Sequence, residues 1–104
     1  MHVISKKAFI EACKEYPSQK DSILNLYRVL EKSDFSSPDE MRKVFRTLDN
    51  FKYKDKWWVI DIGGKKLRMI AFIQFIQNRI YVKHIVSHAE YDKLCKEYSK
   101  RGDK

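Results

Sequence analysis

The spacing of apolar residues changes at Trp57, and this change limits the folds that the chain can adopt. Before Trp57, apolar residues recur three and four positions apart, as on one face of a helix. After it come three apolar runs, "WWVIDI", "LRMIAFIQFI" and "IYVKHIV", which are typical of strands. The pairs Gly63-Gly64 and Gln77-Asn78 separate these runs and predict tight turns. The second half of the chain is therefore predicted to form a three-strand antiparallel meander.

The first half predicts one short strand followed by helices. "HVI" at residues 2–4 is a strand candidate, and Ser5 is placed to cap a helix that Pro17 ends. Ser18 is placed to cap a second helix, because a helical stripe of apolar residues follows it. That stripe consists of Ile23, Leu26, Tyr27 and Leu30.

Two Ser-x-x-Glu sequences predict the starts of two further helices. Ser37 and Glu40 are three positions apart, as are Ser87 and Glu90, which is the spacing of a capping box. The first of these helices should reach about Phe45, and the second closes the chain. Helices and strands thus occupy separate parts of the sequence, which predicts an α+β fold. We expect a single domain over residues 1–104. Its N-terminal helices pack on a small antiparallel sheet, made of the meander and the short N-terminal strand, and a C-terminal helix completes it.

Positive charge is concentrated in the second half of the chain. The net charge is +8 at pH 7. Residues 1–51 hold nine Lys and Arg against eight Asp and Glu, whereas residues 52–104 hold thirteen against six. A one-sided positive field attracts phosphate chains or acidic proteins. The alternative is a lysine-rich surface that only keeps the protein soluble.

The sequence carries no sign of a membrane span, a leader peptide or a disulfide framework. Its longest apolar runs are too short to cross a bilayer, and "MHVISKK" runs straight into charge, unlike a signal peptide. Cys13 and Cys95 lie far apart and match no metal-ligand spacing, so we interpret them as reduced thiols. We therefore expect a cytoplasmic protein.

The stretch "SHAEYD", which begins at Ser87, combines a helix start with residues that can do chemistry. Capping explains Ser87 and Glu90, and Tyr91 is placed to pack on Val86 as a hydrophobic staple. Capping does not explain His88. Its imidazolium form is disfavoured at the positive end of a helix, whereas the free N–H groups there suit a phosphate. The stretch is thus a helix start and also a candidate anion site.

Cations on the predicted strands are further candidates. Arg68 lies on the second strand in line with Ile70, and Lys83 lies on the third strand between Tyr81 and Ile85. A charge in a mostly apolar strand is unusual and indicates a function. For Lys83 the alternative is a side chain that reaches solvent at a sheet edge.

The lysines just before Trp57 permit two interpretations. Lys52, Lys54 and Lys56 would share one face if the segment were extended. On sequence alone, a solvated loop is the favoured interpretation. His84 and His88 are four positions apart, which suits a zinc pair only on a helix, and His84 precedes the helix cap. No metal site is therefore predicted.

Taken together, these motifs resemble the HigB-type toxins of bacterial toxin–antitoxin pairs, a branch of the RelE superfamily. The resemblance lies in "WWVIDIGGKKLRMIAFI" and "RIYVKHIVSHAEYDKL", and it extends to "MHVISKKAF" and "RTLDNFKYKDKWW". It covers nearly the whole chain. Its most specific parts are the glycine hairpin that leads into Leu-Arg and the Ser-His-x-Glu-Tyr-Asp helix start.

The resemblance implies a RelE-like endoribonuclease that needs no metal or cofactor and cuts messenger RNA, usually on the translating ribosome, which inhibits translation and growth. It also implies a partner, a HigA-type antitoxin with a helix-turn-helix domain through which the complex binds operator DNA. By motif position, the family's strand arginine falls on Arg68, and the histidine and tyrosine of the helix start fall on His88 and Tyr91. Lys83 stands where the family often has arginine, so the charge is kept but the bidentate fork is not.

These residue types suit metal-independent cleavage of RNA. Arg68 would clamp the phosphate, His88 can act as acid or base, and Tyr91 can stack on a base or share the proton transfer. The sequence leaves open which residue is the base and which the acid. Besides Lys83, the cations expected to hold the RNA backbone are Lys52, Lys54, Lys56, Lys65, Lys66, Arg79 and Lys93. The alternative is a non-catalytic basic module that binds RNA or the ribosome, which would need these cations but not His88.

Overall fold

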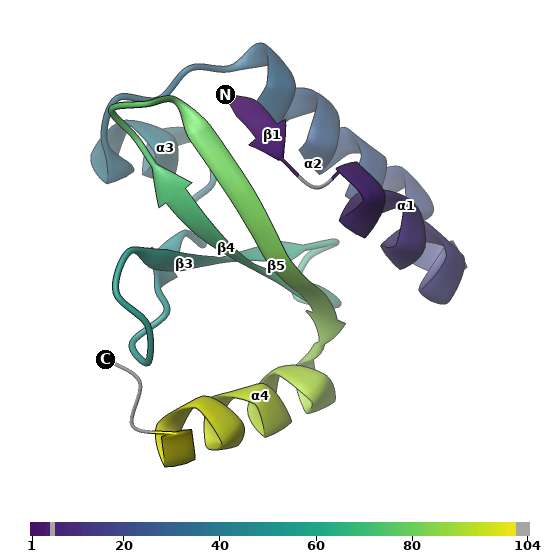
Figure 1. Ribbon diagram of the computed structural model, residues 1–104. Coiled ribbons are helices and arrows are strands. Elements are labelled where there is room, and N and C mark those ends of the chain that lie inside the picture. Colours follow the sequence, from purple (N-terminus) through teal and green to yellow (C-terminus); the bar gives the residue numbers. More distant parts are fainter. Residues whose placement is uncertain (5, 102–104) are drawn as a thin grey trace.

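The computed structural model describes residues 1–4 and 6–101, and in this part four α-helices, one 3-10 turn and five strands follow one another (Figure 1). Their order is β1 (His2–Ile4), α1 (Lys6–Glu15), η1 (Pro17–Gln19), α2 (Lys20–Lys32), α3 (Pro38–Val44), β2 (Asp49–Asn50), β3 (Trp57–Ile62), β4 (Leu67–Gln74), β5 (Arg79–Ser87) and α4 (His88–Arg101). The predicted α+β class is confirmed. None of the helices in the described ranges is long and apolar enough to cross a membrane.

The sheet has the strand order β1-β5-β4-β3-β2. The meander of β3, β4 and β5 is antiparallel, as predicted. β1 pairs with β5 in parallel, so the sheet is mixed and the expectation of an antiparallel sheet was wrong in this detail. The helices between β1 and the meander carry the chain around, so that β5 runs in the same direction as β1. β2 was not predicted, because Asp49 and Asn50 are weak strand formers and pair only where β3 offers its edge.

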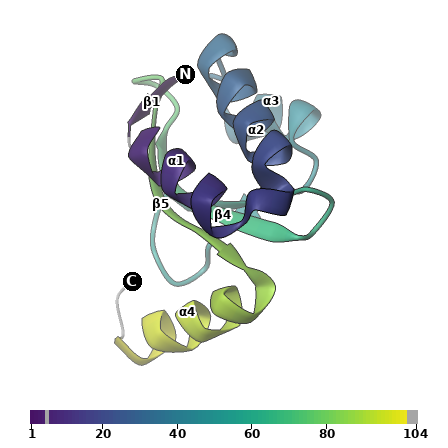
Figure 2. The same cartoon turned by 90° about the vertical axis from the view of Figure 1, so that its right-hand side faces the viewer.

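Two apolar clusters lie on the two faces of this sheet. On β4, Met69 and Ala71 belong to a main core shared with α1 and α2, whereas Ile70 belongs to a smaller core shared with α4. This alternation follows from the period of two along a strand. Figures 1 and 2 show the consequence: α1 and α2 lie together, and α4 lies apart from them beyond the end of β5. The α4 side of the sheet is therefore covered only in part.

A β-bulge interrupts the pairing of β4 with β5. Ile70 pairs with His84, but the next residue, Ala71, pairs with Val82. Lys83 is therefore the extra residue of the bulge. A bulge bends the strand and re-aims its side chains, and bulges are frequent next to active sites. The bulge changes the face on which every residue after Lys83 lies.

Side-chain caps hold the starts of two helices. The Ser37 hydroxyl accepts from the Glu40 backbone N–H at 3.2 Å, and the Glu40 carboxylate accepts from the Ser36 backbone N–H at 3.0 Å. That second bond lowers the pKa of Glu40. The Ser87 hydroxyl accepts from the Glu90 backbone N–H at 3.3 Å. The N-caps predicted at Ser37 and Ser87 are confirmed.

The start of α2 and the turn after β3 differ from the predictions. Ser18 does not cap α2, because Pro17 begins a 3-10 turn that includes Ser18, and α2 then follows Gln19 without a side-chain cap. Ser5, the cap predicted for α1, lies outside the described residues. The turn after β3 spans residues 63–66 rather than two residues, and Gly63 has a φ of +62°. A Cβ at Gly63 would meet the end of the Gln19 side chain, which would have to move, and the positive φ favours glycine at this position.

Candidate functional site

Arg68 and Tyr91 meet where the sheet joins the last helix. Arg68 projects from β4 toward α4, and its guanidinium carbon lies 4.5 Å from the centroid of the Tyr91 ring. The Tyr91 ring in turn packs with its edge toward Phe51, at a centroid distance of 6.2 Å. An arginine stacked on an aromatic face has a fixed plane and keeps its charge. The Arg68 side chain is 30% exposed, so a ligand can still reach it.

Asp61 is the ionic partner of Arg68. The two residues are cross-strand partners on β3 and β4, and an Asp61 carboxylate oxygen lies 3.1 Å from Arg68 Nε. The Nε–H does not point at this oxygen, so the contact is an ion pair without a hydrogen bond, and Nε is a buried atom that lacks a hydrogen-bond partner. The Asp61 backbone N–H donates to the Thr47 hydroxyl at 3.0 Å. The ring of Tyr91 and the carboxylate of Asp61 thus position one guanidinium from two sides.

A small pocket of about 100 Å³ opens at this guanidinium. Asp61 is its acidic wall beside Arg68, and Tyr91 closes it from α4. The pocket is lined by Thr47, Asp49, Asn50, Val59, Asp61, Arg68 and Tyr91. An anion that enters must compete with the Asp61 carboxylate for Arg68, so Asp61 is the resting counter-charge of the site.

Tyr91 is held in its neutral form. Burial raises the pKa of its hydroxyl to about 12, the neighbouring Cys95 thiol adds to this rise, and the Arg68 charge opposes it. At neutral pH the Tyr91 hydroxyl is therefore protonated and can donate a hydrogen bond. It is a poor candidate for the general base.

His88 is the first residue of α4, one helical turn before Tyr91, as predicted. Its side chain is half-buried, and its Nε2 is shielded without a hydrogen-bond partner among the residues that the structure describes. Buried polar atoms normally have a partner, and an exception calls for an explanation such as a catalytic role or a bound molecule. The structure thus brings Arg68, Tyr91 and His88 to one end of α4.

Lys83 lies on the α4 side of the sheet but at a different place. Its Nζ lies 5.7 Å from the centroid of the Trp57 ring. The bulge turns His84 toward α4 as well, where its Nε2 lies 3.0 Å from the Tyr98 hydroxyl. Lys83 and Ile85 do not share one face, as regular alternation along a strand would have it, because the bulge turns Ile85 onto the main core.

The lysines at 52–56 do not lie on an extended segment. The Phe51 backbone N–H donates to the Trp57 carbonyl at 2.9 Å and closes a loop, in which Lys56 has a φ of +63°. The loop that the sequence favoured is confirmed, and the alternative of an extended segment with one shared face is wrong. Lys52 Nζ lies 5.3 Å from the Tyr53 ring centroid, and Lys54 Nζ lies 5.7 Å from the Trp57 ring centroid.

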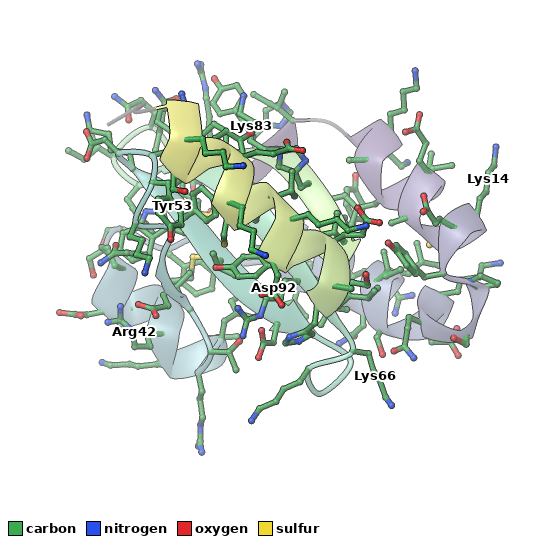
Figure 3. The ribbon with its side chains drawn as sticks, turned by 90° about the horizontal axis from the view of Figure 1, so that it is seen from below. Lys14, Arg42, Tyr53, Lys66, Lys83 and Asp92 are labelled. Carbon is green, nitrogen blue, oxygen red and sulfur yellow. The ribbon has the colours of Figure 1, made fainter. Side chains whose placement is uncertain are left out.

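A groove of about 630 Å³ lies between this loop and the end of α4. Its lining consists of Asn50, Phe51, Lys52, Tyr53, Lys54, Asp55, Lys56, Trp57, Tyr98 and Ser99. Figure 3 shows Tyr53 on the loop beside α4. Sequence reasoning selected the lysines here but missed the aromatic residues. The alternation of aromatic and basic residues in "FKYKDKWW" was the available signal.

The remaining cations predicted to hold RNA are exposed and dispersed. Lys65 and Lys66 lie in the turn between β3 and β4, and Figure 3 shows Lys66 past the starting end of α4, whereas Lys83 lies beside the later half of that helix. Arg79 begins β5, eight residues before Ser87, which is roughly 25 Å along a strand. Lys93 lies on the exposed face of α4. The structure thus does not gather these cations into one patch, and their contact with RNA stays a prediction.

The two thiols of the chain lie on different helices, Cys13 on α1 and Cys95 on α4. Cys13 and Cys95 are free, and Cys95 lies beside Tyr91. Within residues 1–4 and 6–101, three or more His, Cys, Asp or Glu side chains do not come together in a group that could hold a metal ion.

Comparison with known proteins identifies relatives along the whole chain. Residues 19–94 match the family described as HigB_toxin, RelE-like toxic component of a toxin–antitoxin system. A protein of Escherichia coli named mRNA interferase HigB is 53% identical over 98 residues, which cover 94% of this chain and 95% of that protein. A protein of Shigella flexneri with the same name is 36% identical over 104 residues, which cover all of both chains.

Proposed function

The chain belongs to the HigB family of RelE-like toxins of toxin–antitoxin systems, and we propose that it is an endoribonuclease that cuts messenger RNA. The names of its relatives, mRNA interferase HigB, support this proposal. We further propose that it needs no metal ion, that it acts on the translating ribosome in the bacterial cytoplasm, and that cutting inhibits translation and growth.

One observation carries the proposal: Arg68 is a preorganised cation in a pocket at the N-terminal end of α4. Its plane is held by Tyr91 at 4.5 Å and its charge is held by Asp61 at 3.1 Å. Cleavage of RNA without a metal passes through a phosphorane-like state in which negative charge builds up on the phosphoryl oxygens. A donor that is already in place stabilises that charge without reorganisation, and such a donor is worth about 10²–10³ in rate.

Each step of the reaction has a candidate group at this site. The ribose 2′-oxygen attacks the phosphorus and its proton must leave, while the 5′-oxygen departs and must gain a proton. Arg68 exchanges its Asp61 contact for the phosphate. His88 is the candidate for carrying the proton that leaves the 2′-oxygen to the departing 5′-oxygen, because an imidazole can serve as base and then as acid. The neutral Tyr91 hydroxyl donates a hydrogen bond to the reacting phosphate, and Lys83 and the loop lysines hold the strand.

An antitoxin partner follows from the family. We propose that a HigA-type antitoxin with a helix-turn-helix domain holds the toxin inactive, and that the complex binds operator DNA through the antitoxin. The competing function is a non-catalytic basic module that binds RNA or the ribosome. It would use the lysines and Arg68 in the same way but would leave the RNA intact.

The deciding experiment is to incubate the purified chain with RNA or with translating ribosomes and to map the product ends. We expect cuts that leave a 2′,3′-cyclic phosphate or a 3′-phosphate, and on free RNA these cuts should persist in EDTA. If EDTA abolished the cutting of free RNA and one specific metal ion restored it, the metal-independent mechanism would be excluded. Uncut RNA that stays bound to the protein would support the non-catalytic module. A mock preparation from cells that do not express the chain is the control for a contaminating nuclease.

A further inference from the structure

The groove beside Tyr53 has walls made largely of aromatic rings. Phe51 is 2% exposed and forms the base of this wall. Its ring centroid lies 5.6 Å from that of Tyr53, 6.0 Å from that of Trp57 and 5.4 Å from that of Tyr98. Because each of these rings contacts Phe51, the rings form one packed wall. Tyr53 and Trp57 are only half-buried, so they present ring surface to the groove.

Three ammonium groups stand at the rim of this wall. Lys52 Nζ lies over the Tyr53 ring at 5.3 Å, and Lys54 and Lys83 lie over the Trp57 ring, each with its Nζ 5.7 Å from the centroid. Contacts of this kind restrict a side chain that is otherwise flexible. The indole of Trp57 therefore gathers two cations from different elements, the loop and the bulge of β5.

We infer that this groove is a nucleobase pocket, which takes one unpaired base of an RNA strand beside the Tyr53 ring while Lys54 and Lys83 bind the flanking phosphates. Aromatic rings with interleaved cations are the arrangement that binds single strands. In a duplex the bases are stacked on both faces and unavailable to a ring. The groove volume of about 630 Å³ lies within the range of pockets that hold small ligands.

The nucleobase pocket deepens the proposed function and rests on it, because Asn50 connects the groove to the candidate active site. Asn50 lines both the groove and the small pocket at Arg68. A base in the groove and a phosphate at Arg68 would therefore belong to nearby nucleotides of one strand. The groove then selects a nucleotide close to the bond that is cut.

The test measures binding of a strand that cannot be cut. The probe is a fluorescein-labelled 2′-O-methyl RNA of about eight nucleotides, a length within the usual span of a single-strand site, and anisotropy gives its Kd. We expect Tyr53→Ala to raise Kd about tenfold, the scale of a lost base–ring stack, and Tyr53→Phe to bind like the wild type. Tyr81→Ala is the matched control, since Tyr81 packs on Phe72 instead, at 5.7 Å, and should not change Kd.

Salt dependence separates stacking from charge. We expect Lys54→Ala to reduce the slope of log Kd against log salt concentration by about 0.7, the value for one phosphate of a single strand. Tyr53→Ala should leave that slope unchanged. Lys14→Ala, on α1 far from α4 in Figure 3, should change neither Kd nor slope. The inference would be overturned if Tyr53→Ala bound the strand as tightly as the wild type does. It would also be overturned if the wild type bound the same strand more tightly in a duplex.

Two further measurements keep the inference separate from the proposed function. If Tyr53→Ala melts early, Tyr53→Leu replaces it, because leucine keeps an apolar contact to Phe51 without a ring. RNA cleavage by Arg68→Ala is measured in parallel. Cleavage by Arg68→Ala at the wild-type rate would contradict the proposed active site. The Kd values of the Tyr53 variants would then decide on the nucleobase pocket independently. Loss of cleavage in Arg68→Ala with normal binding by Tyr53→Leu contradicts the pocket and leaves the nuclease in place.

Discussion

The Arg68 guanidinium lies against the face of the Tyr91 ring, with its carbon 4.5 Å from the ring centroid. This contact joins β4 to α4, two elements that β5 separates in the chain. Because the ring packs on Phe51 and the guanidinium lies on the ring, the plane of Arg68 is set before a phosphate replaces Asp61 as its partner. The contact is therefore the structural basis for the first prediction.

Arg68→Ala should lower the rate of RNA cleavage by about 10²–10³ while the protein still folds. Arg68→Lys should recover only a small part of this loss, because lysine keeps the charge but can neither stack on Tyr91 nor donate two parallel hydrogen bonds. Single-turnover cleavage and growth arrest at equal expression measure the effect. Unchanged growth arrest by Arg68→Ala would rule out this site.

Asp61→Asn should bind RNA more tightly than the wild type. The amide keeps the size of the carboxylate but removes the charge that competes with phosphate for Arg68, which is 30% exposed. We expect KM to fall about two- to fivefold, the scale of a partly exposed ion pair, with kcat nearly unchanged. Steady-state cleavage across RNA concentrations gives both constants. A rise in KM would show instead that Asp61 is needed to position Arg68.

His88→Gln should lower the cleavage rate by about 10²-fold, since glutamine cannot carry a proton at neutral pH. Its melting temperature should stay close to that of the wild type, because His88 Nε2 has no hydrogen-bond partner to lose among the described residues.

Ser87→Ala is the matched control for the helix start. It removes the cap that accepts from Glu90 at 3.3 Å, so it should cost roughly 1 kcal/mol of stability. Kinetics and thermal unfolding of both variants test this pair of predictions. If His88→Gln cut RNA at the wild-type rate, the residues that follow Ser87 would serve only as a helix start. Lys83 and the lysines at 52–56 would then be the next candidates for catalysis.

Tyr91 should make the protein sensitive to alkaline pH. Its pKa is raised from 10.0 to about 12 in the folded protein. Between these two values the unfolded chain loses the phenolic proton and the folded chain keeps it, so the stability present below pH 10 falls as pH rises toward 12. In Tyr91→Phe this part of the fall should be absent. Denaturant unfolding from pH 9 to about 12 and the absorbance of tyrosinate test this, and an identical pH profile for the variant would contradict it.

Most of the helices and strands could be predicted from the sequence, because they depend on interactions between residues close together in the chain. The change of period at Trp57 separates helices from strands, and the caps at Ser37 and Ser87 depend only on residues three positions apart. Arg68 was identifiable as an unusual charge on an apolar strand. The parallel pairing of β1 with β5 and the short strand β2 were not readable, because each depends on an edge supplied by a distant segment.

Within the site, the sequence by itself determined which residue types lie near the sheet and the last helix, but only the tertiary structure decided which of them meet. The bulge at Lys83 leaves no mark in the alternation of β5, since it arises from pairing with β4. The left-handed backbone at Lys56 and the closing bond from Phe51 to Trp57 turn the lysine segment into a loop. The aromatic groove exists because that loop and α4 pack together, and packing between distant segments is not a property of either sequence alone.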